Sequence, residues 1–502
     1  MQTPSSPPRG RSALPLVLSL VLSAALLAAC SVAPTYQRPD AAVGVAYKES
    51  IPPAESAAWK LAEPADGGDR GRWWTAFGDP VLDRLVDEAA AANPSLKIGF
   101  ARLQQSRAIV RAVDADRAPQ VGIGAGATRS RPSPASLGLP ADADVTPRTV
   151  WRAQLSASYE VDLFGRLASA SAAALAEAER DEGLYRSLQL AIQADVAQTW
   201  FALRGVQAEI ALLDGTVGLR EQALALLERR LTVGEIAELD VARARTELAT
   251  TRAERVALQR RRADLEHALA VLLGKAPSEL SVPQAPLRFA PLHIPAGLPS
   301  ALLERRPDIA AAERAMAAAN ARIGVARAAW FPRLTLTGLL GLESAESGDL
   351  LRRASRSWAL GPLAGTALSM TLFDGGRRRA DEAAAMAAFD EAAAGYRLTV
   401  LGALREVEDG IAAVRSLAQQ AAEFAQARQS AQRAAELSMR RYRAGHVSHL
   451  EVIDAERQVL AAQRSLAQAE RERALAAVAL VRALGGAWDA SAPVATAVAG
   501  SP

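Results

Sequence analysis

The chain has a single cysteine, few aromatic residues and no marked excess of charge of one sign. One cysteine cannot form a disulfide within the chain, which excludes a disulfide-stabilised scaffold. The 58 basic and 55 acidic residues nearly cancel, so nothing in the charge balance favours nucleic acid as a partner. No apolar run of about 18 residues or more follows residue 30, which excludes a bundle of transmembrane helices. The apolar half of the sequence is ample for a hydrophobic core and excludes a disordered protein.

The first thirty residues have the form of a bacterial lipoprotein export signal. Arg9 and Arg11 form a basic start, and an apolar stretch covers residues 13–29. Small residues then precede Cys30, as in a lipobox, so we expect cleavage before Cys30 and lipidation of its thiol. Acyl chains would anchor the protein stably to lipid, because each buried methylene contributes about 0.8 kcal/mol. Ser31, rather than Asp, follows Cys30, which resembles the signal that sorts such lipoproteins to the outer membrane. A membrane anchor helix with an incidental cysteine is the alternative.

The remainder of the chain is predicted to be one unit repeated twice. Residues 229–234 match residues 440–445 at an offset of 211, and Leu273-Gly274 matches Leu484-Gly485 at the same offset. Upstream, Pro94 matches Pro307 at an offset of 213. Chance similarity between alanine-rich helices is the alternative, but it does not produce prolines and glycines in matched order.

The duplication predicts the following segments. They are a signal peptide, 1–29; an N-terminal, lipid-anchored segment, 30–78; repeat 1, 79–274; a linker, 275–299; repeat 2, 300–486; and a C-terminal tail, 487–502.

Each repeat is predicted to contain a helix, two strands, a long helix, a turn and a last helix. The first helix should cover 79–117, with Asp79 as its N-cap. Apolar and polar residues alternate in the segments predicted as strands, which are about 120–131, 150–162, 333–341 and 362–373. Such alternation is typical of a half-buried strand in a soluble sheet and equally of an outer-membrane barrel strand.

The long helices decide between these possibilities. Residues 166–230 and 377–443 contain no proline, and a helix of about 65 residues would be about 100 Å long. Such a length indicates a coiled coil or a helical tube, with turns at 232–238 and 444–448 joining each long helix to a shorter one. Four strands cannot close a transmembrane barrel, which needs about eight, so several chains must pool their strands.

Several motifs resemble those of the TolC family of outer-membrane efflux channels, and the lipoprotein start resembles its NodT/OprM-like branch. The motifs are Pro34–Pro39, Trp73-Trp74, Asn93–Leu96, Arg305–Ile309, Leu372–Gly376 and Arg441–Gly445. The resemblance implies a mixed α and β fold with a long coiled-coil helical tunnel and a transmembrane β-barrel shared by a homotrimer, four strands from each chain. It implies an outer-membrane location, lipid-anchored, with the tunnel in the periplasm. It also implies an equatorial region built from the segments outside the long helices, which are 30–78, 275–299 and the C-terminal tail.

The function implied by this resemblance is that of a passive exit duct in a tripartite efflux pump, carrying drugs or other small solutes. Its partners would be a periplasmic adaptor (membrane fusion) protein and an inner-membrane transporter of the resistance-nodulation-division type. One alternative is a TolC-like duct for protein secretion, although the lipidation signal and the segment around Tyr36 favour efflux. Another is a structural coiled-coil lipoprotein without a pore, against which the alternating strands argue.

No group of residues has the spacing of a catalytic site, so we expect no enzyme and no cofactor. His446 and His449 lie three residues apart at a turn and could seat a metal, but no further ligands complete a site. We therefore expect no metal.

The two turns are the expected docking sites for the adaptor. Gly234 and Gly445 lie where the chain reverses direction, so each is expected to need a backbone conformation that is costly for other residues. The alternative is that both glycines only end their helices.

The second turn is also the expected periplasmic gate. Glu451 and Asp454 match the family's aspartate-ring positions, and Leu450 matches an apolar constriction in lipoprotein relatives. The alternative is that the acidic residues only favour the helix N-terminus through its dipole.

A latch is expected to hold this gate shut. Asp240 and Tyr442 match a hydrogen-bonded pair that joins the two helix hairpins in the family. Val447 occupies the place of the family's latch arginine, so the closed state should be held less firmly or by other residues.

Overall fold

The computed structural model describes residues 32–38, 47–49, 71–287, 289, 305–360 and 368–486. The predicted signal peptide, the Cys30 lipidation site and the tail 487–502 lie outside these residues, as do parts of both predicted equatorial segments. The chain forms two compact units, which are described separately. Unit 1 comprises 1–39, 104–181 and 312–396, and unit 2 comprises 40–103, 182–311 and 397–502.

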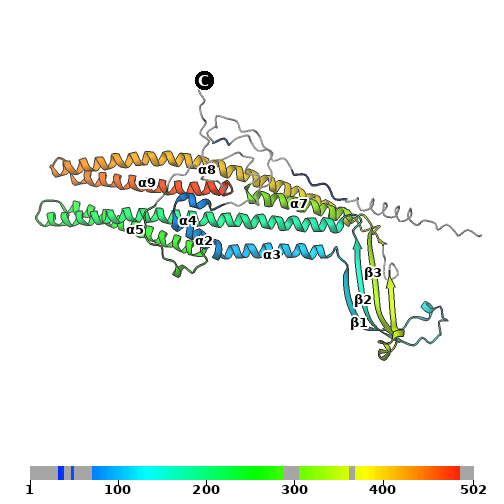
Figure 1. Cartoon of the computed structure of the whole chain (residues 1–502). Helices are drawn as coiled ribbons and strands as arrows, with labels where there is room; N and C mark the ends of the chain where they lie inside the picture. Colours follow the sequence, from blue (N-terminus) through cyan, green and yellow to red (C-terminus); the bar gives the residue numbers. More distant parts are fainter. Residues whose placement is uncertain are drawn as a thin grey trace, which may run out of the picture. The chain divides into compact units, whose positions relative to one another are not determined.

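Seven α-helices and five short 3-10 helices occur in the described part of the chain (Figure 1). The α-helices are α2 (Pro80–Ala92), α3 (Pro94–Ala115), α4 (Arg166–Thr232), α5 (Glu238–Leu272), α7 (Pro307–Ala328), α8 (Arg377–Arg443) and α9 (His449–Ala483). The 3-10 helices are η1 (Trp73–Phe77), η2 (Pro134–Leu137), η3 (Pro277–Glu279), η4 (Ser347–Asp349) and η5 (Arg353–Ser355). No helix in this part of the chain is long and apolar enough to cross a membrane.

Matching helices of the two repeats have equal lengths. The helices α4 and α8 have 67 residues each, α5 and α9 have 35 each, and α3 and α7 have 22 each. The sequence offset of 211 therefore relates whole helices, and the offset of 213 relates α3 to α7.

The single helix expected over 79–117 is two helices. Asn93 interrupts it with extended backbone (φ −56°, ψ 123°), because Pro94 disfavours a helical conformation in the residue before it. The Asn93 side-chain oxygen accepts hydrogen bonds from the backbone N–H groups of Ser95, at 2.8 Å, and Leu96, at 3.2 Å, and so begins α3. Asp79 caps α2 as predicted, by accepting from Val81 N at 2.9 Å.

Unit 1 contains an antiparallel sheet in the order β1-β2-β3-β4. The strands are β1 (Gln120–Ser130), β2 (Arg148–Val161), β3 (Arg333–Ser344), β4 (Arg356–Leu360) and β5 (Leu368–Ser369). Since β2 pairs with one side of β3 over 334–344, β4 and β5 follow one another along its other side.

The fourth predicted strand, 362–373, differs from the structure. The strand β4 ends at Leu360, before that range begins, and only the two residues of β5 lie within it. Residues 361–367 lie outside the described part of the chain. The position of β4 is set by pairing with β3, where Leu360 faces Gly338, and the weak local alternation did not reveal this non-local pairing.

The two faces of the sheet differ in chemistry. One row of side chains crosses the four strands β1 to β4. It consists of Ile123, Leu155, Leu340 and Trp358, each paired with the next on the neighbouring strand. These four side chains are exposed, Ile123 to 84% and Trp358 to 72%. On the other face, Arg152 and Glu343 form an ion pair at 2.9 Å. The sheet therefore has an exposed apolar face and a polar face.

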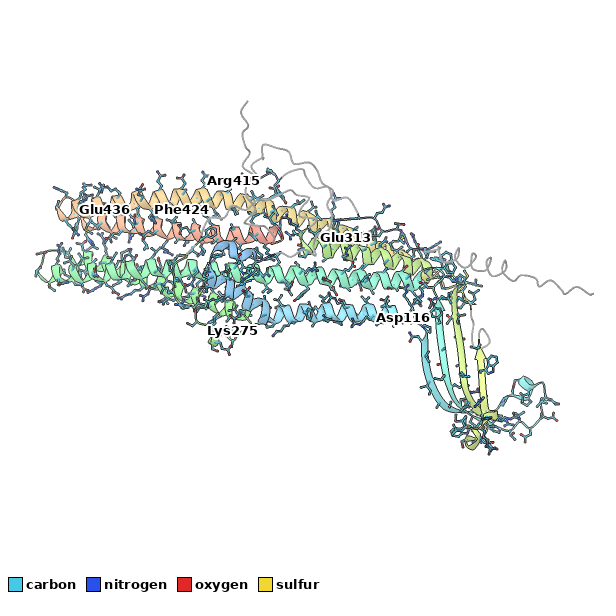
Figure 2. All side chains as sticks on the ribbon, viewed as in Figure 1. Asp116, Lys275, Glu313, Arg415, Phe424 and Glu436 are labelled. Atoms are coloured by element: carbon cyan, nitrogen blue, oxygen red, sulfur yellow. The ribbon has the colours of Figure 1, made fainter. Side chains whose placement is uncertain are left out.

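The N-terminal segment of unit 1 is held against the helices. The Tyr36 hydroxyl donates to Glu313 Oε1 at 2.6 Å, and the Asn320 amide donates to the Pro34 carbonyl at 2.9 Å; Figure 2 labels Glu313. Burial, and then the hydrogen bond to Glu313, raise the pKa of Tyr36. Arg38 also donates to the Tyr396 hydroxyl, at 3.1 Å.

The core of unit 2 lies where η1 and α2 pack against α4, α5 and α9. Trp200 and Phe201 of α4 are 1% exposed, and the Phe77 ring lies 5.0 Å from that of Phe201. The Trp200 indole donates to the second carboxylate oxygen of Asp79 at 2.7 Å, so the residue that caps α2 also contacts the core.

Two helix hairpins extend from this core within unit 2. The first hairpin is residues 182–272, with α5 folding back along α4, and the second hairpin is residues 397–483, with α9 folding back along α8 (Figure 1). Near its turn, the first hairpin packs Leu227 against Val241 and Ala244. The second packs Ala421 and Phe424 against Leu466 (Figure 2 labels Phe424).

Candidate functional site

Both hairpin turns have the same backbone structure. Gly234 and Gly445 each have φ of +76°, in the left-handed region, so the prediction of a costly backbone conformation is confirmed. Each glycine N–H and the N–H after it donate to carbonyls of the last helical turn, at 3.0 Å in the first hairpin and 2.9 Å in the second. This pattern is the Schellman motif that ends many helices. Nothing lies within 4 Å of a Cβ placed at either glycine, so the requirement is conformational rather than steric.

The turns carry exposed apolar side chains. Val233 and Leu239 flank the first turn and are 69% and 57% exposed. Leu450, the candidate constriction, lies just after the second turn and is 39% exposed. Each hairpin therefore presents apolar surface at its end.

The two candidate gate acids have different surroundings. Asp454 Oδ1 lies 3.4 Å from Arg457 Nη1, which compensates part of its charge. The Glu451 side chain is exposed and forms no ion pair within the described part of the chain. Both residues lie in the first two turns of α9, so the favourable interaction with the helix dipole is available to them as well.

The candidate latch has a different hydrogen-bond partner from the expected one. The Tyr442 hydroxyl accepts from Arg230 Nη1 at 3.2 Å, so an arginine of the first hairpin reaches the second. Within the described residues, no hydrogen bond joins Tyr442 to Asp240. The Asp240 carboxylate instead acts electrostatically on His449. Arg230 therefore places a positive charge beside Tyr442. Its position differs from that of the expected latch arginine, where this chain has Val447.

His449 is packed between the hairpins. Its ring meets the Tyr442 ring edge-on at 5.2 Å, and its Nδ1 atom is buried without a hydrogen-bond partner. Burial lowers the pKa of His449, nearby Arg230 lowers it further, and Asp240 opposes both effects. A cavity of about 230 Å³ lies beside it, lined among others by Arg443 and Glu456. Burial therefore favours the uncharged form of the imidazole.

Sequence reasoning missed Arg230 and considered His449 only as a metal ligand. The signal for Arg230 was present, since it belongs to the matched motif 229–234, but its partner lies 212 residues away. Among the described residues, no three His, Cys, Asp or Glu side chains are grouped closely enough to hold a metal ion.

Comparison with known proteins identifies the family. The outer membrane efflux protein family matches residues 85–275 and 298–486 of this chain. The sequence is 36% identical to the outer membrane protein OprJ of Pseudomonas aeruginosa, over 94% of this chain and 96% of that protein. It is 34% identical to the solvent efflux pump outer membrane protein SrpC of Pseudomonas putida, over 93% of this chain and 97% of that protein.

Solved structures agree with this result. The outer-membrane channel OprN superposes with a TM-score of 0.78 at 33% identity, covering 88% of this chain and 99% of OprN. The chain therefore belongs to the outer membrane efflux protein family, and the resemblance to TolC-family channels and the mixed α and β channel fold are confirmed. It is the outer-membrane exit duct of an efflux pump.

Proposed function

We propose that this exit duct works as a homotrimer at the outer end of a tripartite efflux pump. The observation that carries the proposal is the exposed apolar row Ile123, Leu155, Leu340 and Trp358. In the described sheet, β1 lies at one edge and β4 with β5 at the other, and open edges are not tolerated in lipid. Three chains joined edge to edge would close the sheet with these apolar rows facing lipid.

The lipid anchor would be an addition to this closed sheet. We expect Cys30 to be lipidated and the helical tunnel to lie in the periplasm. Because the strands already hold the trimer in the membrane, Cys30→Ser behind a cleavable signal should leave trimers in the outer membrane. Complete loss of trimers from membrane fractions would contradict this.

The two turns would dock the periplasmic adaptor. Their identical backbone geometry at Gly234 and Gly445 and their exposed Val233, Leu239 and Leu450 support this role. An inner-membrane transporter of the resistance-nodulation-division type would supply the energy, and the duct would be passive, with no enzymatic activity and no cofactor.

The gate would be formed by the second turn of each chain around the trimer axis. Leu450 would form the apolar constriction, and Glu451 and Asp454 would form acidic rings that attract cations. Tyr442, with Arg230 and Asp240 of the first hairpin, would hold the closed state. Binding of the adaptor would shift the population toward an open state in which the second hairpin has moved.

The proposed cargo is a drug or another small solute. The name of the SrpC relative gives solvent as what its pump exports. The test is dye accumulation in a bacterial strain that lacks its own ducts. The chain, expressed with an adaptor and a transporter, should lower the accumulation of an exported dye, and omission of the adaptor is the control.

Three results would separate the alternatives. Trimers in the outer membrane with unchanged dye accumulation would contradict the efflux role. Export of a polypeptide by the same cells would favour the secretion duct. Purified protein that neither forms heat-resistant trimers nor conducts ions in planar bilayers would favour the structural lipoprotein.

A further inference from the structure

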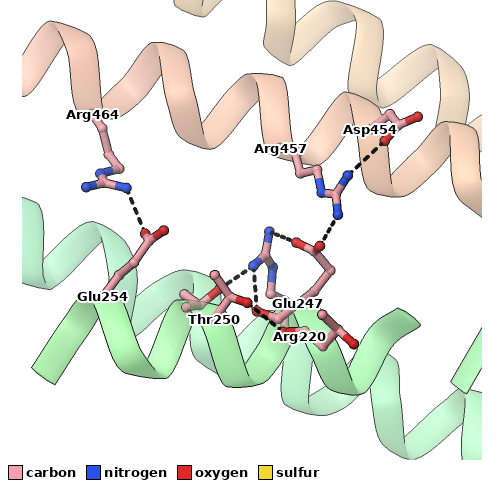
Figure 3. Close-up of polar contacts among 9 residues, drawn as sticks. Arg220, Glu247, Thr250, Glu254, Asp454, Arg457 and Arg464 are labelled. Carbon is pink, nitrogen blue, oxygen red and sulfur yellow. Dashed lines mark hydrogen bonds and ion pairs between the residues drawn. The ribbon is translucent and has the colours of Figure 1, made fainter. Parts of the chain in front are cut away.

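Three arginines lie at heptad spacing on α9, and each pairs with a glutamate of the first hairpin. Figure 3 shows the pairs of Arg457 and Arg464. A spacing of seven residues returns to the same face of a helix in a coiled coil. We call these pairs the arginine ladder; its three rungs are Arg457 with Glu247, Arg464 with Glu254, and Arg471 with Glu209.

The rung closest to the turn is a branched ion pair. Arg457 donates to Glu247 Oε1, and Arg220 of α4 approaches the other oxygen of Glu247 at 3.1 Å. The Arg457 side chain is 53% exposed, whereas that of Glu247 is 13% exposed. The hydrogen bond from Arg457 holds the pKa of Glu247 below its usual value, so the carboxylate remains charged over a wide pH range.

The middle rung is partly exposed. Arg464 Nη1 lies 2.7 Å from Glu254 Oε2, and both side chains keep contact with solvent. Water can therefore replace either partner.

The rung farthest from the turn is the most buried. Arg471 Nη1 lies 2.8 Å from Glu209 Oε1, and the Glu209 side chain is only 2% exposed. Gln468 donates to the other oxygen of Glu209 at 3.0 Å. Gly205, one turn before Glu209, provides the space, because a Cβ there would lie 2.6 Å from the Arg471 side chain.

The ladder is absent from the equivalent positions of the duplicated unit. At the offset of 211, the three arginines correspond to Thr246, Ala253 and Arg260, and the three glutamates to Gln420, Gln458 and Ser465. Gly205 corresponds to Ser416. A face that served only solubility would be equally useful in both repeats. In all three pairs the acid lies on the first hairpin and the base on the second, so each pair joins the two hairpins.

We propose that the arginine ladder is a graded lock between the hairpins, in which the two rungs nearer the turn separate when the duct opens and the Glu209–Arg471 rung stays closed as the pivot. The proposal rests on the proposed function, since it concerns the opening of an efflux duct. Arg464 and Glu254 can exchange each other for water at little cost, because both are partly exposed. Glu247 is more buried, but it keeps Arg220 as a partner when Arg457 separates. Separation of Arg471 would leave the Glu209 charge buried and unpaired, which is far more costly. Movement that starts at the turn is therefore expected to stop at this rung.

The first test is cross-linking in cells. One variant carries Glu247→Cys with Arg457→Cys, and the other carries Glu209→Cys with Arg471→Cys; a short bifunctional thiol reagent joins each pair. We expect the link near the turn to abolish dye efflux and the link at the pivot to leave it unchanged. Equal effects of the two links, whether both abolish or both spare efflux, would overturn the proposal.

The second test does not require substitution of the buried glutamate. Arg457→Glu with Arg464→Glu should raise the conductance of purified trimers in planar bilayers several-fold, and adding Glu254→Arg should reverse the part of the rise that is due to Arg464. Glu247 is left unchanged, because it also pairs with Arg220. Arg473→Glu is the matched control. Arg473 lies on the same helix but not at the seven-residue spacing of the ladder, and it forms no ion pair within the described residues.

The outcomes separate the two proposals. Unchanged conductance in the double arginine variant, or an equal rise in the Arg473→Glu control, would overturn the ladder. If the wild-type chain fails to export dye, the proposed function is wrong, and the bilayer measurement still decides whether the ladder restrains the channel.

Discussion

The two hairpins have the same helix lengths and the same turn geometry, yet they differ in burial and in charge. The first hairpin is fixed in the core of unit 2 through Trp200, Phe201 and Leu203 of α4, each no more than 1% exposed. The second hairpin contributes fewer buried side chains from α8, where Val407 and Ala421 are among the exceptions. The two hairpins therefore share helix lengths and turn geometry, but α4 of the first carries more buried side chains than α8 of the second.

The largest expected difference between the hairpins concerns stability. Trp200→Ala should destabilise unit 2 by about 3–5 kcal/mol, because it removes a fully buried aromatic side chain. Phe424→Ala in the second hairpin should cost clearly less, since Phe424 is only partly buried. Thermal unfolding followed by circular dichroism measures both. Equal losses would show that the second hairpin is held as firmly as the first.

Substitution of the turn glycines should have the next largest effect. Gly445→Val forces a branched side chain into the left-handed region, at about 1–2 kcal/mol of strain. We expect efflux to be lost while trimers remain intact, because the docking geometry changes. Gly402→Ala is the control, since this helical glycine of α8 has open space around it. Normal adaptor cross-linking in Gly445→Val would contradict the docking role.

Removal of the latch should have a moderate effect. Tyr442→Phe deletes the hydroxyl that accepts from Arg230, an interaction worth about 0.5–1.5 kcal/mol. Combined with Asp240→Ala, it should raise conductance in planar bilayers further. A double variant with wild-type conductance would show that these residues do not restrain the closed state.

Block by multivalent cations distinguishes the two gate acids. Glu451→Ala with Asp454→Ala should remove the block, because concentrated negative charge binds such ions. Glu451→Ala alone should account for most of the loss, since Arg457 compensates Asp454. Glu423→Ala, an exposed acid of α8 far from the turn, should leave the block unchanged. Retention of full block in the double variant would mean that the acids do not lie at the constriction.

The smallest expected effect is a pH dependence of the closed state. The groups around His449 come from all four helices: Arg230 of α4, Asp240 of α5, Tyr442 and Arg443 of α8, and Glu456 of α9.

Burial lowers the pKa of His449 from 6.5, so the free histidine binds a proton at a higher pH than the packed one. The closed packing therefore loses stability as pH falls from above 6.5 through the lowered pKa, and the loss is complete below it. Conductance should rise over this range. His449→Gln should flatten the profile, and His446→Gln should not. An unchanged profile in His449→Gln would assign the dependence to another group.

Local sequence signals predicted the long helices. The features that the sequence did not predict depend on contacts between residues far apart in the chain or on the backbone conformation. The absence of proline predicted helices over 166–230 and 377–443, and the structure has α4 over Arg166–Thr232 and α8 over Arg377–Arg443. Pro94 was visible within the predicted helix 79–117, but only the extended backbone of Asn93 shows that it begins a new helix.

The candidate site shows the same division. The positive φ of Gly234 and Gly445 follows from a local reversal of the chain and was predictable. The bond from Arg230 to Tyr442 joins residues 212 positions apart, so it required the packing of the hairpins to be known. The seven-residue spacing of Arg457, Arg464 and Arg471 is present in the sequence. Their glutamate partners could not be predicted from it, because they lie more than 200 residues away.

The two oxygens of Asp79 connect a local event in folding to a distant one. One oxygen caps α2 by accepting from the backbone N–H groups of Val81 and Leu82. The other oxygen accepts from the indole of Trp200, 121 residues away. The cap is therefore most favourable once α4 has docked. When the core opens, α2 should lose this stabilisation and unfold with it. Its amide hydrogens should exchange with solvent at the rate of those around Trp200, as one cooperative unfolding unit.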